Sequence, residues 1–179
     1  MALFRGLNVG RANRIAMSDL LALLRALGFT DVQTLLNSGN AIYRSPGSTA
    51  ATDAIRIRAA VLEKFHVDAH VIVRTAHQID EIIAHNPLLD IAHDHSRLIV
   101  VFVQQASALD SLAELARHDW EPDVLAVTAH AAYLWCGVGI LESRVAPLLL
   151  KPPRDAGTTR NWTTLLKIAA ALHGAAKKA

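Results

Sequence analysis

The hydrophobic pattern of the first 75 residues predicts six short elements in the order strand, helix, strand, strand, helix, strand. Leucines recur at helical spacing before Gly28, which is a typical helix stop, and residues 37–40 have the composition of a hairpin turn. Thr52 or Asp53 is suited to cap the second helix. The predicted strands are 2–5, 31–36, 41–44 and 69–74, and the helices are 17–27 and 54–65. This order is that of the ferredoxin-like split βαβ unit.

The rest of the chain gives a second, similar pattern. The near-continuous β-branched run 98–103 predicts a central strand. Around it we expect a short helix ending at Asn86-Pro87, a helix at 109–116, hairpin strands at 124–128 and 133–136, and helices at 142–150 and 159–172. The fold class is therefore α+β, with two ferredoxin-like subdomains at residues 1–75 and 76–179. The pattern leaves open whether the second subdomain is complete.

Composition excludes a few classes of protein but does not identify a function. Hydrophobic residues make up 52% and charged residues 19% of the 179 residues, which is ordinary for a globular protein. Cys136 is the only cysteine, so a disulfide within the chain and a cysteine-based zinc site are excluded. The sequence has neither an apolar run of membrane-spanning length nor a signal-peptide layout. We expect a cytoplasmic protein without membrane contact, and its oligomeric state is open.

Charge is distributed unevenly along the chain. Residues 1–14 hold three arginines and no acid, and residues 151–179 hold six basic residues against Asp155 alone. The segment between them carries nine basic and fifteen acidic residues. If folding brings the two basic ends together, they form one basic site on a mildly acidic body.

Four motifs together resemble one family, the bacterial "domain of unknown function 1697". They are Leu3-Phe4-Arg5-Gly6-Leu7-Asn8-Val9-Gly10, Leu27-Gly28-Phe29, Ser38-Gly39-Asn40 and Thr159-Arg160-Asn161-Trp162. Each motif alone is weak, but their order and combination are specific and extend over nearly the whole chain. The resemblance implies two linked ferredoxin-like subdomains and implies no activity.

Two features depart from the family pattern. Family members usually have several more residues before the first Arg-Gly, so the opening strand is expected to be truncated. Ser143-Arg144 stands where the family tends to have a Ser-Lys pair, which keeps the charge but changes the donor geometry.

Residues 5–14 hold arginines, asparagines and glycines between a strand and a helix, where backbone amides and the helix dipole favour anions. The segment has neither the Walker nor the dinucleotide-binding glycine pattern. The alternative is a simple strand-to-helix connection with solvated arginines. Ser38-Gly39-Asn40 could present donors to the same site, although a hairpin turn explains it better.

The segment 159–162 is predicted to open the last helix, capped by Thr158 or Thr159, with Trp162, Leu165, Leu166, Ala169 and Leu172 on its buried face. A cation in the first helical turn opposes the dipole, and a bound anion would remove that conflict. Arg160 is therefore the best single candidate for ligand contact.

The sequence gives weaker support for a metal site or a catalytic nucleophile. His93-Asp94-His95 has a metal-like spacing, but polar loops of this kind are common on surfaces, so neither a metal nor a cofactor is expected. Cys136 fits a small buried residue better than a nucleophile. Catalysis therefore stays undecided.

Three functions remain open. The first is non-catalytic binding of a phosphate-bearing small molecule or nucleic acid, although only Tyr43 and Phe102 could stack on bases. The second is an enzyme acting on a phosphorylated or carboxylated small molecule, and the third is a protein-interaction or assembly module. The residues expected to contact the ligand are Arg5, Gly6, Asn8, Gly10, Arg11, Asn13, Arg14, Ser38, Asn40, Thr159, Arg160, Asn161 and Lys167.

Overall fold

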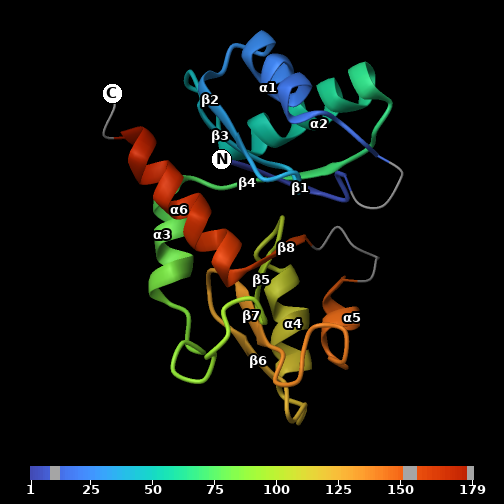
Figure 1. The fold of residues 1–179 in the computed structure, drawn as a ribbon, viewed down its shortest axis with the longest axis vertical. Helices are drawn as coiled ribbons and strands as arrows, with labels where there is room; N and C mark the ends of the chain where they lie inside the picture. Colours follow the sequence, from blue (N-terminus) through green and yellow to red (C-terminus); the bar gives the residue numbers. More distant parts are fainter. Residues whose placement is uncertain (9–12, 151–156, 177–179) are drawn as a thin grey trace. The chain divides into compact units, whose positions relative to one another are not determined.

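The computed structural model describes residues 1–8, 13–150 and 157–176, and it has an α+β fold with two four-stranded antiparallel sheets and six helices in those ranges (Figure 1). The chain forms two compact units. The first comprises Met1–Ala76 together with the last residues from Ala170 on, and the second comprises His77–Ala169. Each unit contains one of the two sheets.

The first unit has the element order predicted from the hydrophobic pattern. Its elements are β1 (Ala2–Arg5), α1 (Met17–Ala26), β2 (Thr30–Leu35), β3 (Asn40–Arg44), α2 (Ala50–Phe65) and β4 (His70–Val73). The strand order is β2-β3-β1-β4, so β1 is an inner strand that pairs with β3 on one side and β4 on the other. The short opening strand is thereby paired along both edges.

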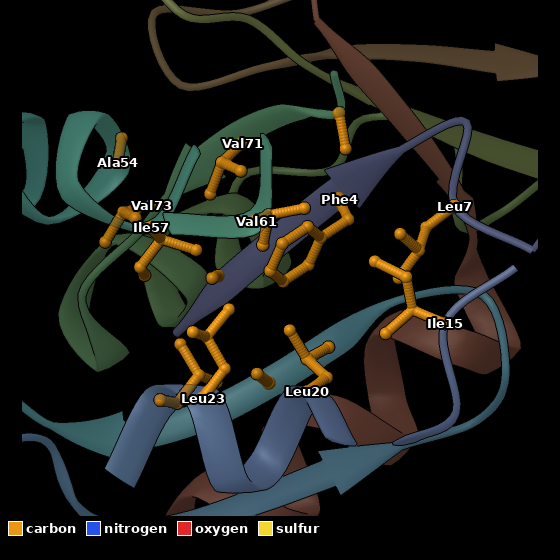
Figure 2. Close-up of a cluster of buried hydrophobic side chains, with 14 of the residues drawn as sticks. Phe4, Leu7, Ile15, Leu20, Leu23, Ala54, Ile57, Val61, Val71 and Val73 are labelled. Carbon is orange, nitrogen blue, oxygen red and sulfur yellow. The ribbon is translucent and has the colours of Figure 1, made fainter. Parts of the chain in front are cut away.

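A single apolar core joins the sheet of the first unit to α1 and α2. Figure 2 shows side chains from these elements converging on Phe4 of β1, which is 1% exposed. Leu20 and Leu23 reach it from α1, and Ile57 and Val61 from α2, as the helical spacing predicts. Burial of these apolar side chains holds both helices on one face of the sheet.

The ends of these helices differ in part from the prediction. Thr49, rather than Thr52 or Asp53, caps α2, because its side-chain oxygen accepts a hydrogen bond from Thr52 N at 3.2 Å. Asp53 is instead 2% exposed and accepts hydrogen bonds from the hydroxyls of Ser45 and Ser48. The predicted stop of α1 is correct, since Gly28 follows the helix with a φ of +86°.

The second unit adds eight elements. They are α3 (Ala76–Ala84), β5 (Leu98–Phe102), α4 (Ala108–Ala116), β6 (Val124–Val127), β7 (Ala132–Trp135), α5 (Ala146–Leu150), β8 (Thr158–Asn161) and the beginning of α6 (Trp162–Ala176). The strand order is β6-β7-β5-β8. β5 is buried along its whole length between β7 and β8, which confirms the predicted central strand.

Both faces of β5 are covered. Ile99, Val101 and Val103 belong to an apolar core that includes residues of α4 and α5. On the opposite face, Val100 is paired in register with Tyr133 of β7, whose hydroxyl donates a hydrogen bond to the Ile82 carbonyl of α3 at 2.7 Å. The sheet therefore presents no open face along its central strand.

The main error of the sequence-based prediction concerns the last strand and the helix after it. Residues 158–161 form β8, which supplies the fourth strand of the second sheet, and the helix begins only at Trp162. Asn161, rather than Thr158 or Thr159, caps α6, because its Oδ1 accepts a hydrogen bond from Thr164 N at 2.9 Å. Leu166 is 38% exposed, whereas Ile168 is fully buried.

The predicted helix 142–150 is shorter in the structure. α5 begins at Ala146, because the Ser143 hydroxyl accepts hydrogen bonds from Val145 N and Ala146 N at the start of the helix. Within the described residues, none of the helices is long and apolar enough to cross a membrane.

Candidate functional site

The loop after β1 is held together by its asparagines. Asn8 Oδ1 accepts a hydrogen bond from Ile15 N at 2.8 Å, and Asn8 Nδ2 donates to Ile15 O at 3.0 Å and to Asn37 O at 2.9 Å. Asn8 and Asn13 have φ values of 57° and 56°, a left-handed conformation that asparagine adopts more readily than most residues. Loop geometry therefore explains both asparagines, and Gly10 and Arg11 lie outside the described residues.

Replacing Asn8 by alanine should destabilise this loop. The change removes three hydrogen bonds to the backbone and puts alanine in a left-handed conformation, and we expect the free energy of unfolding to fall by about 2 kcal/mol. Asn37→Ala is the matched control, because that side chain is exposed and its backbone carbonyl is retained. Urea denaturation of both variants measures the difference, and equal midpoints would contradict the role given to Asn8.

The arginines of this loop differ in exposure. Arg5, at the end of β1, is half-buried, and Arg14 is exposed. Gly6 is exposed and has a φ of +75°, and Asn13 Nδ2 lies 3.4 Å from its carbonyl oxygen. Ligand contact by Arg5, Gly6, Asn13 and Arg14 stays a prediction.

Ser38 and Gly39 lie in the turn between β2 and β3, and Asn40 begins β3, in agreement with the preferred interpretation of the sequence as a hairpin turn. Asn40 is 0% exposed, and its Nδ2 donates to Leu35 O at 2.9 Å and to Ser38 Oγ at 3.2 Å. Gly39 O accepts a hydrogen bond from Phe4 N at 2.9 Å. These contacts close the hairpin against β1.

Arg160 lies in β8 rather than in a helix, so its predicted conflict with the helix dipole does not exist. The residue is 8% exposed, and its Nη1 donates to Thr158 Oγ1 at 2.9 Å and to Thr159 O at 2.7 Å. Arg160 pairs with Val100 of β5, so it lies on the sheet face opposite the α4 core. Desolvation by burial lowers the pKa of Arg160 to about 10, and the guanidinium remains cationic at neutral pH.

The other candidates near the start of α6 have different surroundings. Thr159 and Asn161 are half-buried, and the side-chain oxygen of Asn161 is engaged in capping α6. Lys167 is exposed on that helix. Residues 5–14 and 157–167 belong to different units, so a cleft shared by both segments stays a prediction.

The Ser143-Arg144 pair is built into the second unit. Ser143 is 4% exposed, and its hydroxyl donates to Asp123 Oδ2 at 2.7 Å. Arg144 Nη2 donates to Glu121 O at 3.2 Å, and its guanidinium lies 6.0 Å from the centre of the Trp120 ring. Both side chains therefore join the loop before α5 to the segment before β6.

Cys136 has the buried position expected from the sequence. Its side chain is 0% exposed, and burial raises the pKa of the thiol to about 11. Because the thiolate is the nucleophilic form, this cysteine is unreactive at neutral pH.

A histidine and glutamate cluster in the second unit has no recognised motif. Glu81, His85 and His130 place one potential ligand atom each within 4.8 Å of one another. The helical spacing of Glu81 and His85 is visible in the sequence, but His130 is far along the chain and only the fold brings it close. In the His93-Asp94-His95 segment, Asp94 Oδ1 accepts hydrogen bonds from the amide and hydroxyl of Ser96.

Comparison with known proteins identifies the family and the fold. The family model described as "Protein of unknown function (DUF1697)" matches residues 1–133, and the chain belongs to this family. A solved structure, that of the conserved bacterial protein SP0830 from Streptococcus pneumoniae, is similar with a TM-score of 0.73 and 22% sequence identity, over 96% of each chain. No curated protein matches the sequence. At this identity the structural likeness shows the fold alone.

Proposed function

We propose that this protein binds a phosphate-bearing ligand without catalysing a reaction, and that Arg160 is the main anion-binding residue. The observation that carries the proposal is a buried arginine, 8% exposed as a residue, whose guanidinium donates hydrogen bonds to Thr158 and Thr159. Its pKa of about 10 keeps it charged at neutral pH. A cation that has already lost its water gains more from an anion than a hydrated surface arginine does.

The ends of the chain add further positive charge. Arg5 and Arg14 are the described basic residues of the first basic segment, and Lys167 is exposed on α6. We propose that Lys167, Thr159 and Asn161 assist Arg160 within the second unit. For the first unit we propose that Arg5 and Arg14 contact an anion independently, with Gly6, Asn8, Asn13, Ser38 and Asn40 shaping the loops around them. A small phosphorylated molecule fits this arrangement better than a nucleic acid. Phe102 is 0% exposed, and the ring of Tyr43 packs against Phe29 at 4.4 Å between centroids, so neither aromatic ring is available to stack on bases.

We also infer that both units are ferredoxin-like. Each has two inner strands that come first and third in its strand sequence, with orders β2-β3-β1-β4 and β6-β7-β5-β8. In each unit one helix follows the first strand and another precedes the fourth. This is the connectivity of the split βαβ unit, and it supports no activity by itself because such units host many functions.

The proposal predicts ligand-dependent stabilisation that requires the Arg160 charge. Inorganic phosphate, pyrophosphate and a panel of phosphorylated metabolites are added separately, and thermal unfolding is followed. A ligand at one hundred times its Kd stabilises the folded state by about 2.7 kcal/mol, which raises the Tm clearly. In Arg160→Met the ligand-induced rise in Tm should disappear, and in Arg160→Lys part of it should remain.

Arg117→Met is the matched control. Arg117 has a side chain that is 73% exposed and pairs with Glu114 at 3.0 Å, so this change removes one positive charge from the same unit. It should leave the ligand-induced rise in Tm unchanged. The proposal is wrong if no phosphorylated compound stabilises the wild type, or if Arg160→Met responds as the wild type does. Salt-sensitive binding to RNA or DNA alone would favour a nucleic-acid partner instead.

A further inference from the structure

We propose that Glu81, His85 and His130 form a binding site for a divalent transition metal ion of the zinc class. Glu81 lies on α3, His85 follows that helix directly, and His130 lies in the turn between β6 and β7. One ligand atom of each residue lies within 4.8 Å of the other two. The site is contained in the second unit and involves none of the basic residues proposed to bind the phosphate.

The spacing of the polar atoms is close to that of a coordination shell. Glu81 Oε2 lies 3.6 Å from His130 Nε2. Two tetrahedral ligands with metal bonds of about 2.1 Å are about 3.4 Å apart. The Glu81 and His130 atoms therefore need to move only slightly to bind one ion.

The hydrogen bonding of His85 prepares this ring for coordination. His85 Nδ1 lies 2.9 Å from the Glu81 carbonyl oxygen, which can only accept, so Nδ1 carries the proton and the Nε2 lone pair is free for a metal. Metal-bound histidines commonly donate their other ring N–H to a carbonyl in this way. The His85 and His130 rings stack at 4.7 Å between centroids, so the two imidazoles lie side by side.

Contacts around His130 keep it near α3. The Thr128 hydroxyl oxygen accepts hydrogen bonds from His130 N at 3.2 Å and Ala131 N at 3.3 Å, which fixes the turn. The buried Tyr133 hydroxyl donates to Ile82 O at 2.7 Å and ties β7 to the same helix that carries Glu81. α3 and the turn that carries His130 are thus held together without an ion, which lowers the free-energy cost of arranging the ligands around one.

The donor set selects the class of metal. Two imidazoles and one carboxylate suit Zn²⁺, Co²⁺ or Ni²⁺, whereas Mg²⁺ and Ca²⁺ prefer oxygen ligands throughout. Three protein ligands leave a coordination position for water or for a ligand. The Glu81 and His130 side chains are 33% and 34% exposed, so an ion can reach them from solvent.

Isothermal titration of the chelator-treated protein with Zn²⁺, and of a second sample with Mg²⁺, tests the site. We expect one Zn²⁺ per chain and no comparable Mg²⁺ binding. Glu81→Gln, His85→Ala and His130→Ala should each weaken Zn²⁺ binding at least ten-fold. A parallel titration with Co²⁺, followed by its visible absorption, should show a band of low-coordinate Co²⁺ in the wild type that is weaker in each variant.

His93→Ala is the matched control, since His93 is an exposed histidine of the same unit outside the cluster. It should leave the Zn²⁺ affinity unchanged. Circular dichroism melts of the metal-free variants separate loss of a ligand from loss of the fold, and Glu81→Gln is the least disruptive change. The inference is overturned if the wild type binds no Zn²⁺, or if folded His130→Ala or Glu81→Gln binds it with wild-type affinity.

Discussion

Replacing Gly39 by alanine should lower the free energy of unfolding by about 3 kcal/mol, through backbone strain and overpacking together. Gly39 has a φ of +75°, a conformation that costs an alanine about 1 kcal/mol or more. A Cβ atom at this position would lie 2.8 Å from Phe4 Cβ and 3.2 Å from Leu7 Cβ. Neither neighbouring atom can move without shifting its backbone, because each is attached directly to a Cα atom.

Gly28→Ala separates the two causes. Gly28 has a similar φ of +86°, and a Cβ atom there would meet nothing within 4 Å. This variant should therefore lose only about 1–2 kcal/mol from backbone strain. Urea denaturation of both variants gives the difference, and a Gly39 variant no less stable than the Gly28 variant would contradict the close packing of the turn against β1.

The same result bears on the function of the Ser38-Gly39-Asn40 motif. The hairpin explanation requires glycine for packing and a buried Asn40 for its hydrogen bonds to Leu35 O and Ser38 Oγ. A large loss of stability on replacing Gly39 would account for this part of the motif through folding alone. Ligand contact would then rest mainly on the arginines.

Much of the first unit is predictable from the sequence because its periodicities are strong. The leucines before Gly28 and the alternating strand at 69–74 each point to one structure, and β4 (His70–Val73) and α1 lie where expected. The wrongly predicted cap of α2 shows that two hydrogen-bonding roles compete for one side chain. Asp53 can cap a helix, but its carboxylate accepts hydrogen bonds from the hydroxyls of Ser45 and Ser48 instead.

β8 could not be recognised from the sequence alone. Thr158–Asn161 is polar and leads directly into an amphipathic helix, so its composition is that of a helix cap. The segment becomes a strand because it pairs with the edge of β5 that β7 does not occupy, with Val100 opposite Arg160 and Phe102 opposite Thr158. Such non-local pairing overrides local propensity.

The candidate site was predicted in part for the wrong reason. The sequence favours Arg160 because it predicts a helix start at this residue, whereas the structure shows Arg160 buried in a strand of the second sheet. The sequence gives no sign of a role for His130, because its partners lie far away along the chain: Glu81 is on α3, and His85 directly follows that helix. Contacts that depend on tertiary structure leave no periodic signal in the chain.

Replacing Asp123 by alanine should destabilise the second unit by about 3 kcal/mol. Asp123 is 4% exposed, and its carboxylate accepts hydrogen bonds from Ser143 Oγ at 2.7 Å and from Gly137 N at 3.2 Å. Alanine leaves both donors without this acceptor in a buried place, and each such loss costs about 1–3 kcal/mol. Asp123→Asn keeps one acceptor oxygen, so it should lose less.

Asp119→Ala is the matched control for this change, because Asp119 is exposed in the same segment and accepts one hydrogen bond from Glu121 N at 3.1 Å. It should cost less than 1 kcal/mol. Chemical denaturation of the three variants orders them, and an Asp123→Ala variant as stable as Asp119→Ala would contradict the buried network. The predicted order would mean that the Ser143 hydroxyl links the Asp123 carboxylate to the first residues of α5. The fold, rather than a ligand, would then explain the serine of the Ser143-Arg144 pair.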